Sequence, residues 1–336
     1  MPGPGCPVER PDRVPELPEV EVVRAGLEPA VSGARVLHVD VVDDRALTRH
    51  DGPAEDFADR LTGRTIAAAV RRGKFLWMPL QPEHDGDRPE ALVAHLGMSG
   101  QILLGRGRPA AKHRRILIDV QPAGTDRSGA AEPPVELEFV DQRTFGSMAI
   151  DAMVPTIDGA PAGFGGQVDA IDPDAVWRRW VPGQVSHIAR DPLDPAFDDD
   201  RFTAMARKRS SGIKRVLLDQ GVVSGIGNIY ADESLWAAKL HYDRAADRLT
   251  RADLRRLLDE VRAILRRALE DGGTSFDAQY VNVNGQSGYF SQRLNVYGQQ
   301  GKPCPRCGTT IVREAFTNRS SHICPVCQPR PRARTR

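Results

Sequence analysis

Four cysteines near the carboxyl end of the chain have the spacing of metal ligands. They form two Cys-x2-Cys pairs, Cys304 with Cys307 and Cys324 with Cys327, and residues 308–323 lie between the pairs. Thiolates at this spacing match a tetrahedral structural zinc site, with each pair on a tight turn. Disulfide bonds are the alternative, which a cytoplasmic chain disfavours. A site closed by four cysteines leaves no open coordination position, so we predict one zinc ion with a structural role.

The residues between the two cysteine pairs alternate in polarity, as two short strands would. The pattern over 311–321 predicts a β-hairpin with Thr317–Arg319 near its tip. Such a hairpin is too small for a core of its own, so the metal must supply its rigidity. Arg319 at the tip can enter a groove or bind a phosphate, whereas a surface arginine that only aids solubility is the alternative. A zinc hairpin alone fits many classes of protein, including ribosomal and transcription modules.

A second candidate site is the glycine-rich turn Gly225-Ile226-Gly227, which joins two predicted helices. Glycine permits positive φ and close approach of another backbone. Free N–H groups at the start of the following helix can bind a phosphate, and Asn228 can add a side-chain donor. On this pattern alone, a plain structural turn is the favoured alternative.

The basic residues are unevenly distributed along the chain, although the formal net charge is only +1. Residues 293–336 carry nine Lys or Arg and one acid, Glu314, so the rest of the chain is mildly acidic. A basic carboxyl-terminal module on an acidic body favours a polyanionic partner such as nucleic acid. A solvated basic tail over residues 329–336 is the alternative reading.

Length and composition exclude several classes of protein. The 336 residues are enough for two domains with separate cores, and 27% are charged, which is typical of a soluble globular protein. We find no apolar stretch of the length needed to span a membrane. Residues 1–13 hold four prolines and do not resemble a signal or transit peptide, so we expect a cytoplasmic protein without a membrane partner.

The first half of the chain predicts a helix followed by short strands. Pro18–Gly33 has apolar residues on one helical face, with a proline suited to the first turn and a glycine suited to the stop. Short strands separated by turn signals favour a sandwich or barrel. The expected strands are Val36–Val42, Thr65–Val70, Phe75–Leu80, Leu92–Leu104, Arg115–Val120 and Val135–Val140.

The second half predicts helices. A Gly- and Pro-rich stretch at 158–167 marks a linker, and helical patterns follow from about residue 197. Thr250 can cap a long helix with one apolar stripe that stops at Gly272-Gly273. The shorter expected helices are Arg201–Arg209, Ile213–Gln220 and Tyr230–Leu240.

Six motifs follow one another over roughly residues 14–328. They are Pro15-Glu16 with the run that follows, His95–Gly100, Asp141–Gly146, the turn through Tyr230–Glu233, Gly288–Phe290 and the zinc hairpin. In this order they resemble the superfamily of endonuclease VIII and the formamidopyrimidine-DNA glycosylases, bacterial enzymes that excise oxidised purines. Leu17 after Pro-Glu, together with Met98, favours the formamidopyrimidine branch.

The resemblance implies an α+β fold: an N-terminal β-sandwich with a flanking helix, a helical helix–two-turn–helix domain, and a four-cysteine zinc β-hairpin. We therefore expect a catalytic domain over 14–157, a linker over 158–196 and a DNA-binding domain over 197–290. A zinc module over 291–328 and a basic tail over 329–336 would follow. The resemblance also implies a monomer that acts in the bacterial cytoplasm, at the nucleoid.

The resemblance also assigns catalytic roles. Pro15 would be the nucleophile, through a free amino-terminal secondary amine, and Glu16 its general acid/base partner. Lys74 would hold a phosphate near the lesion, and Arg319 would join this catalytic group. For Lys74, a surface lysine at a strand end is the alternative.

Further residues are implied in DNA binding. Met98, Arg143 and Phe145 match the three residues that fill the space left by a base flipped out of the duplex. His95, Asn228 and Arg319 would bind backbone phosphates around the lesion. The alternative places Met98 and Phe145 in the core.

Three features depart from the family pattern. Residues 1–13 precede Pro15, whose nitrogen is then an amide that cannot attack. Valine at position 14 is what a GTG start codon gives when it is translated as internal sequence, so we expect Val14 to be the true initiator and residues 1–13 a non-native leader. Asp277 stands where other members place a lysine, and Asn318 replaces a more usual Gln.

These observations predict a bifunctional DNA glycosylase and AP lyase of base excision repair. It would excise 8-oxoguanine and formamidopyrimidines from duplex DNA through a Schiff base on Pro15, followed by β,δ-elimination. The expected partner is double-stranded DNA with an oxidised purine or an abasic site. Two alternatives remain: a non-catalytic damaged-DNA-binding protein, if residues 1–13 are retained, and a zinc-dependent RNA- or ribosome-binding module.

Overall fold

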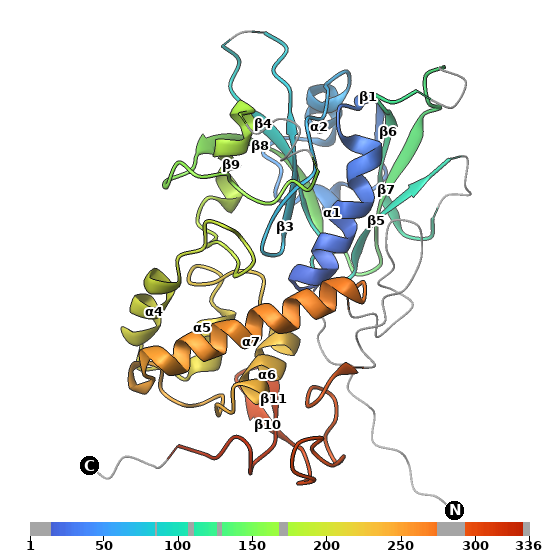
Figure 1. Ribbon diagram of the computed structural model, residues 1–336. Coiled ribbons are helices and arrows are strands. Elements are labelled where there is room, and N and C mark those ends of the chain that lie inside the picture. The colour runs from blue at the N-terminus through green and yellow to red at the C-terminus, as the bar shows by residue number, and fades with distance from the viewer. Residues whose placement is uncertain are drawn as a thin grey trace, which may run out of the picture.

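The computed structural model describes residues 15–84, 86–106, 111–125, 130–167, 174–273 and 293–331. A strand-rich N-terminal part lies beside a helical C-terminal part, and the zinc hairpin adjoins the helices (Figure 1). The α+β class is confirmed. Three sequence expectations lie outside the described residues: the start at Val14, the loop with Asp277 and Gly288–Phe290, and residues 332–336 of the tail.

Two antiparallel sheets form the N-terminal part. The first has the strand order β1-β6-β7-β5, and the second has the order β2-β3-β4-β8-β9. The strands of the first sheet are β1 (Arg35–Val41), β5 (Gly100–Gly105), β6 (Arg114–Gln121) and β7 (Val135–Asp141). Those of the second are β2 (Val70–Arg72), β3 (Phe75–Leu80), β4 (Glu90–His95), β8 (Ser147–Pro155) and β9 (Trp180–Pro182).

The inner faces of both sheets share one apolar core. Ile118 and Leu137 of the first sheet join Leu92 and Ile150 of the second in a single buried cluster. Helices α1 (Leu17–Val31) and α2 (Ala54–Leu61) add their apolar faces to it. The expected β-sandwich with a flanking helix is therefore present.

The strand expected over Leu92–Leu104 is instead two strands, β4 and β5, which belong to different sheets. The chain turns at 96–99, where Gly97 has φ +59° and an added Cβ would lie 2.5 Å from the backbone of Phe145. The apolar residues at both ends of 92–104 suggest one strand, whereas Gly97 and Gly100 between them mark the bend. Helix α2 and strands β8 and β9 were not among the predicted elements.

The expected linker at 158–196 contains packed structure. It supplies β9 to the second sheet, and its side chains cover the outer face of that sheet. Val181, Val185 and Ile188 pack there against Trp77 and Val93. Short 3-10 helices in the chain are η1 (Asp44–Leu47), η2 (Val176–Arg179), η3 (Gly183–Val185) and η4 (Ala246–Arg248).

The C-terminal part is built on the long helix α7 (Arg251–Glu270). Thr250 caps it, the Thr250 side chain and Asp253 form a capping box, and Gly272 and Gly273 end it with positive φ. The other helices are α4 (Asp199–Arg207), α5 (Ile213–Leu218) and α6 (Asn228–Ala237). The hairpin strands are β10 (Val312–Phe316) and β11 (Arg319–Ile323).

One apolar cluster joins these helices to both neighbouring parts of the molecule. Leu17 of α1 and Phe316 and Ile323 of the hairpin are buried in the same core as α5, α6 and α7. The start of α1 therefore lies where the two parts of the protein meet. No helix in the described ranges has the length and apolarity that a membrane span requires.

Candidate functional site

The start of α1 holds Pro15 and Glu16 in a defined position. Glu16 is the N-cap residue, and its backbone N–H donates a hydrogen bond of 2.9 Å to Oε2 of Glu19. Pro18 lies in the first turn, where the missing N–H costs no helical hydrogen bond. The backbone N–H of Leu17 donates to the carbonyl of Gly225, which ties the helix start to the glycine-rich turn.

The Glu16 carboxylate lies against the first turn of α6, although the two segments are more than 200 positions apart. It accepts hydrogen bonds from the backbone N–H groups of Gly227 (2.5 Å), Ile229 (2.8 Å) and Tyr230 (3.3 Å). A helix N-terminus stabilises negative charge in this way. Gly227 is needed because a Cβ at that position would lie 2.4 Å from Cδ of Glu16.

Glu16 is suited to proton transfer near neutral pH. Burial raises the pKa of its carboxyl group from 4.5 to about 7, and the negative charge of Glu19 acts in the same direction. The positive charge of Lys74 and the backbone N–H groups oppose this rise. A carboxyl group that titrates near pH 7 can both donate and accept a proton at that pH.

Pro15, Lys74, His95 and Arg319 line one small cavity of about 230 Å³. They come from the start of α1, the β2–β3 turn, the end of β4 and the tip of the zinc hairpin. Sequence reasoning predicted each of them as a site residue, and the fold brings them together. Glu16 does not line the cavity. Its carboxylate is buried next to the cavity, against the start of α6.

Lys74 is held by a turn that docks onto the C-terminal part. Gly73 has φ +57°, and its N–H donates to Oδ2 of Asp191 at 3.1 Å. The same oxygen pairs with Arg71 at 2.9 Å, and Arg71 also binds Glu21 of α1. Burial lowers the pKa of Lys74, whereas the charge of Glu16 opposes that change.

His95 presents a neutral imidazole to the cavity. Burial and the charges of Arg49 and Lys74 lower its pKa to about 4. Its Nδ1 lies 3.2 Å from the backbone N–H of Gly97, which donates to it. The neutral ring therefore carries its proton on Nε2, where it can donate a hydrogen bond to a phosphate oxygen.

Arg143 and Phe145 lie together on an exposed loop after β7. Asp141 is fully buried and holds this loop, since it accepts hydrogen bonds from the N–H groups of Arg143 (3.0 Å) and Gly146 (2.7 Å). The Arg143 guanidinium lies 5.2 Å from the centre of the Phe145 ring, which is 54% exposed. Phe145 is thus not a core residue, and Met98 on the adjoining turn is half-buried.

Asn228 lies at the start of α6 and is nearly buried. Its side-chain Nδ2 donates to the carbonyl of Ser320 on the hairpin at 3.1 Å. This bond uses one of the two amide hydrogens, so the second remains for a phosphate. Its predicted role in phosphate binding stays a prediction.

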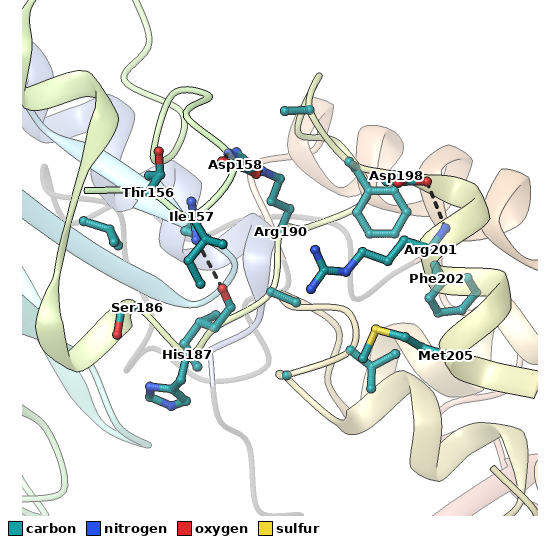
Figure 2. A pocket seen from close by; sticks show the side chains of 18 of the residues that line it. Thr156, Ile157, Asp158, Ser186, His187, Arg190, Asp198, Arg201, Phe202 and Met205 are labelled. Carbon is teal, nitrogen blue, oxygen red and sulfur yellow. Dashed lines mark hydrogen bonds and ion pairs between the residues drawn. The ribbon is translucent and has the colours of Figure 1, made fainter. Parts of the chain in front are cut away.

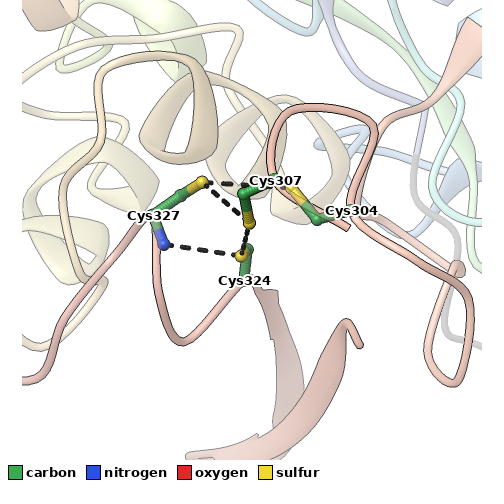
Figure 3. A group of neighbouring side chains, drawn as sticks. All are labelled: Cys304, Cys307, Cys324 and Cys327. Carbon is green, nitrogen blue, oxygen red and sulfur yellow. Dashed lines mark hydrogen bonds between the residues drawn. The ribbon is translucent and has the colours of Figure 1, made fainter. Parts of the chain in front are cut away.

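The four predicted cysteines converge at the base of the hairpin (Figure 3), with all their Sγ atoms within 4.8 Å of one another. Neighbouring Sγ atoms are 3.4 Å apart for Cys307 and Cys324, and 4.0 Å for Cys304 and Cys327. A tetrahedron with zinc–sulfur bonds of about 2.3 Å has sulfur atoms about 3.8 Å apart. The donor set therefore fits one structural zinc ion.

Side chains of α6 attach the zinc module to the helices. Asp232 accepts from the N–H of His322, and Glu233 accepts from the backbone N–H groups of residues 295–297. The indole N–H of Trp236 lies 3.4 Å from Sγ of Cys304. Lys214 is fully buried, and its Nζ binds Asp232 at 2.6 Å.

Sequence reasoning missed several residues that support the site. Glu19, whose Oε1 accepts from the Tyr230 hydroxyl at 2.9 Å, links Glu16 to α6. Asp141 and Tyr230 stand within the motifs used above, so the motifs themselves carried a signal for them. Lys214 follows an apolar residue at the start of α5 and has no such signal.

Three family models match consecutive parts of the chain. Residues 14–148 match the N-terminal domain of formamidopyrimidine-DNA glycosylase, and residues 188–279 match the H2TH domain of the same enzyme. Residues 301–330 match a zinc finger found in FPG and IleRS.

Curated proteins and solved structures are similar over nearly the whole chain. The formamidopyrimidine-DNA glycosylase of Leifsonia xyli is 58% identical over 318 residues, which is 94% of this chain and 99% of the relative. That of Kineococcus radiotolerans is 51% identical, with 95% and 99% covered. Lactococcus lactis Fpg in complex with DNA that contains an oxidised pyrimidine is 30% identical, with a TM-score of 0.72, and 94% and 100% are covered. Its complex with abasic-site DNA has 29% identity, the same coverage and a TM-score of 0.71.

Proposed function

The chain belongs to the formamidopyrimidine-DNA glycosylase family, and from this premise we propose how its residues excise a base and cleave the strand. The protein is a DNA glycosylase of oxidised-base repair with one structural zinc site. We infer 8-oxoguanine and formamidopyrimidines in duplex DNA as substrates, and abasic sites as substrates of a lyase activity. One observation carries this proposal: Pro15, Lys74, His95 and Arg319 converge on one cavity, with Glu16 buried beside it.

The nucleophile in this proposal is the secondary amine of Pro15 in a protein that begins at that residue. The damaged nucleotide must leave the duplex before its C1′ can be reached. The Pro15 nitrogen forms a bond to C1′, the base departs with the electron pair of the glycosidic bond, and the proton lost by the nitrogen goes to the departing base. The sugar ring then opens at the C1′–O4′ bond, O4′ takes a proton from Glu16, and a cationic iminium remains.

Glu16 then works as a base. The iminium acidifies the C2′ hydrogens, and removal of one of them by the carboxylate expels the 3′-phosphate with its bonding electrons. A second elimination releases the 5′-phosphate and leaves a one-nucleoside gap. A pKa of about 7 allows Glu16 to give a proton in one step and to take one in the next.

The cationic and neutral donors around the cavity fit the strand on either side of the lesion. Lys74 and Arg319 supply positive charge, and His95 supplies an N–H donor. Arg143 and Phe145 stand exposed on one loop, where the ring can wedge into the stack and the guanidinium can bond to the orphaned base. We assign this role of filling the duplex to them together with Met98.

We place catalysis in residues 14–157, DNA binding in residues 197–290, and zinc binding in residues 291–328. The protein would act as a monomer on chromosomal DNA. The two named relatives come from bacteria, so the nucleoid is its proposed place of action.

Borohydride trapping on an 8-oxoguanine duplex tests the proposed chemistry. Reduction converts the iminium into a stable covalent adduct between protein and DNA. A protein that begins at Pro15 should form this adduct and cleave the strand. The full 336-residue chain is the matched control, because its Pro15 nitrogen is an amide that cannot attack C1′. This chain should bind the duplex without forming an adduct.

The outcomes separate chemistry from binding. Absence of an adduct with the Pro15-initiated protein would refute the role of Pro15 as nucleophile. Lesion-specific binding without cleavage by that same protein would instead favour a damaged-DNA-binding protein. Equal trapping by both forms would show that a different amine attacks C1′.

A further inference from the structure

The side chain of Gln220 lies in the turn between α5 and α6, close to the proposed catalytic residues. Gln220 and Pro15 line the same cavity of about 230 Å³. The amide of Gln220 bonds to the backbone of its own turn. Its Nε2 donates to the carbonyls of Leu218 (3.1 Å) and Ile226 (3.0 Å), and its Oε1 accepts from the N–H of Gly225 (3.0 Å). These partners fix the orientation of the amide, since a flipped group would place its nitrogen against an N–H and its oxygen against two carbonyls.

The turn held by these bonds makes close contact with α1. Gly225 has φ +87°, and a Cβ on it would lie 2.8 Å from Cδ1 of Leu17. The carbonyl of Gly225 accepts from the N–H of Leu17 at 3.0 Å, and the N–H of Gly227 donates to the Glu16 carboxylate. Gln220 therefore holds the two residues that lie directly before the N–H group bonded to Glu16.

The segment that follows β9 holds the outer side of the same turn. The N–H of Ala189 donates to the backbone carbonyl of Gln220 (2.9 Å), and the carbonyl of Arg190 accepts from the N–H of Ser224 (3.3 Å). The side chain of Arg190 pairs with Asp158, which follows β8 (Figure 2). Backbone contacts thus hold the turn from outside, whereas the amide of Gln220 joins the end of α5 to the residues before α6 from within.

We propose that Gln220 is a positioning residue for Glu16, because its amide holds the turn in the shape that brings the start of α6 against the start of α1. The inference rests on the proposed role of Glu16 as acid and base. An apolar side chain of similar length would leave the N–H of Gly225 and two carbonyls without this partner, and the turn would relax. The N–H groups of Gly227 and Ile229 would then bond less well to the carboxylate. Since these bonds lower the pKa of Glu16, their weakening raises it.

Hydrogen exchange of the zinc-loaded 336-residue chain tests the geometry without any chemistry. In Gln220→Met, the backbone amides of Leu17 and Gly227 should exchange at least about tenfold faster than in the original chain, because their acceptors move. Gln121→Met is the matched control, since the amide of Gln121 also donates to a backbone carbonyl, that of Glu132, at the end of β6. It should leave both exchange rates unchanged.

Strand cleavage at a preformed abasic site by the Pro15-initiated protein tests the consequence for catalysis. Gln220→Met should lower the single-turnover rate about tenfold or more. It should also raise the pH of half-maximal rate by about half a unit or more, because a step that needs the Glu16 carboxylate then requires a higher pH. Loss of stability alone would leave this pH unchanged, as Gln121→Met should.

Gln220→Glu provides a second test, which also serves if Gln220→Met does not fold. A protonated carboxyl group can accept from Gly225 and donate to Ile226, as the amide does, whereas a carboxylate cannot donate. Protection of the Leu17 amide, relative to the original chain at the same pH, should therefore rise as the pH falls. Relative protection that does not depend on pH would contradict the role of the amide.

The outcomes keep this inference apart from the proposed function. Unchanged exchange of Leu17 and Gly227 in Gln220→Met, or an unchanged pH of half-maximal cleavage, would overturn the positioning role. If the Pro15-initiated protein with Gln220 intact neither cleaves nor forms an adduct, the proposed function fails. Exchange alone then decides whether Gln220 holds the start of α6 against Glu16.

Discussion

Helix α6 contacts the rest of the protein in two different ways along its length. Its first turn meets Glu16 through backbone N–H groups, and Gly227 makes room for that contact. Its later turns meet the zinc module through the side chains of Asp232, Glu233 and Trp236. The first contact joins the helix to the chemistry, and the second joins it to the hairpin that carries Arg319.

The difference has a physical consequence. A backbone contact is lost when an added atom keeps the two segments apart, whereas a side-chain contact is lost when a donor or acceptor is removed. The two ends of α6 can thus be disturbed separately. If they act independently, damage to the zinc module should leave Glu16 in place, and damage at Gly227 should leave the hairpin in place.

Removal of zinc should have the largest effect. Without the metal the four cysteines take up protons and no longer pin the hairpin, so we expect loss of DNA binding and of strand cleavage. Hydrogen exchange should show that β10 and β11 lose protection after chelation, and that α1 keeps it. Restored zinc should restore both. Loss of protection at α1 as well would show that the two ends of α6 are coupled.

Asp232→Asn should have the next largest effect, a loss of stability, because it leaves the fully buried Lys214 without its carboxylate partner. Breaking a buried ion pair in this way costs about 3–5 kcal/mol of unfolding free energy. Urea unfolding of the zinc-loaded protein measures it. The double variant Lys214→Met with Asp232→Asn removes the charge and should recover part of the loss. A single variant as stable as the original chain would contradict the importance of this pair.

The same contrast explains which parts of the site could be predicted from the sequence. The zinc site was predictable because Cys304 and Cys307, like Cys324 and Cys327, lie close in sequence, and their spacing alone defines the geometry. The cavity residues lie far apart in the sequence, so only the resemblance to a known family placed Lys74 and His95 beside Pro15.

Contacts made by backbone atoms are hard to predict from a sequence, because they do not depend on the side chain. The hydrogen bonds from α6 to Glu16 depend on no side chain of α6. Their trace in the sequence is Gly227, where a Cβ would clash with Glu16. Lys214 shows the opposite problem. Its charge predicts a surface residue, and its partner Asp232 becomes evident only when α5 and α6 are packed together.

Gly227→Ala should affect chemistry rather than stability of the hairpin. The new Cβ would lie 2.4 Å from Cδ of Glu16 and would push the carboxylate off the helix start. Loss of a positioned general acid/base slows a reaction by about 100-fold or more. Single-turnover base excision by the Pro15-initiated protein measures the change, with zinc content as a check. Gly221→Ala in the same turn, where a Cβ would meet Asp219 at 3.3 Å, should retain activity. Equal activity of the two variants would show that Glu16 does not need its contact with α6.

Glu19→Gln should have the smallest effect and reports on the charge around Glu16. The negative charge of Glu19 helps to raise the pKa of Glu16 to about 7, so its removal favours the charged form and lowers that pKa. A step that needs the Glu16 carboxylate should then reach half its maximal rate at a pH lower by less than about one unit. Strand cleavage at a preformed abasic site, followed in single turnover across the neutral pH range, gives this midpoint. Glu28→Gln at the far end of α1 is the matched control, because Glu28 pairs with Arg24. A midpoint that stays unchanged or rises in Glu19→Gln would mean that burial of Glu16, rather than its acidic neighbour, controls proton transfer at this end of α6.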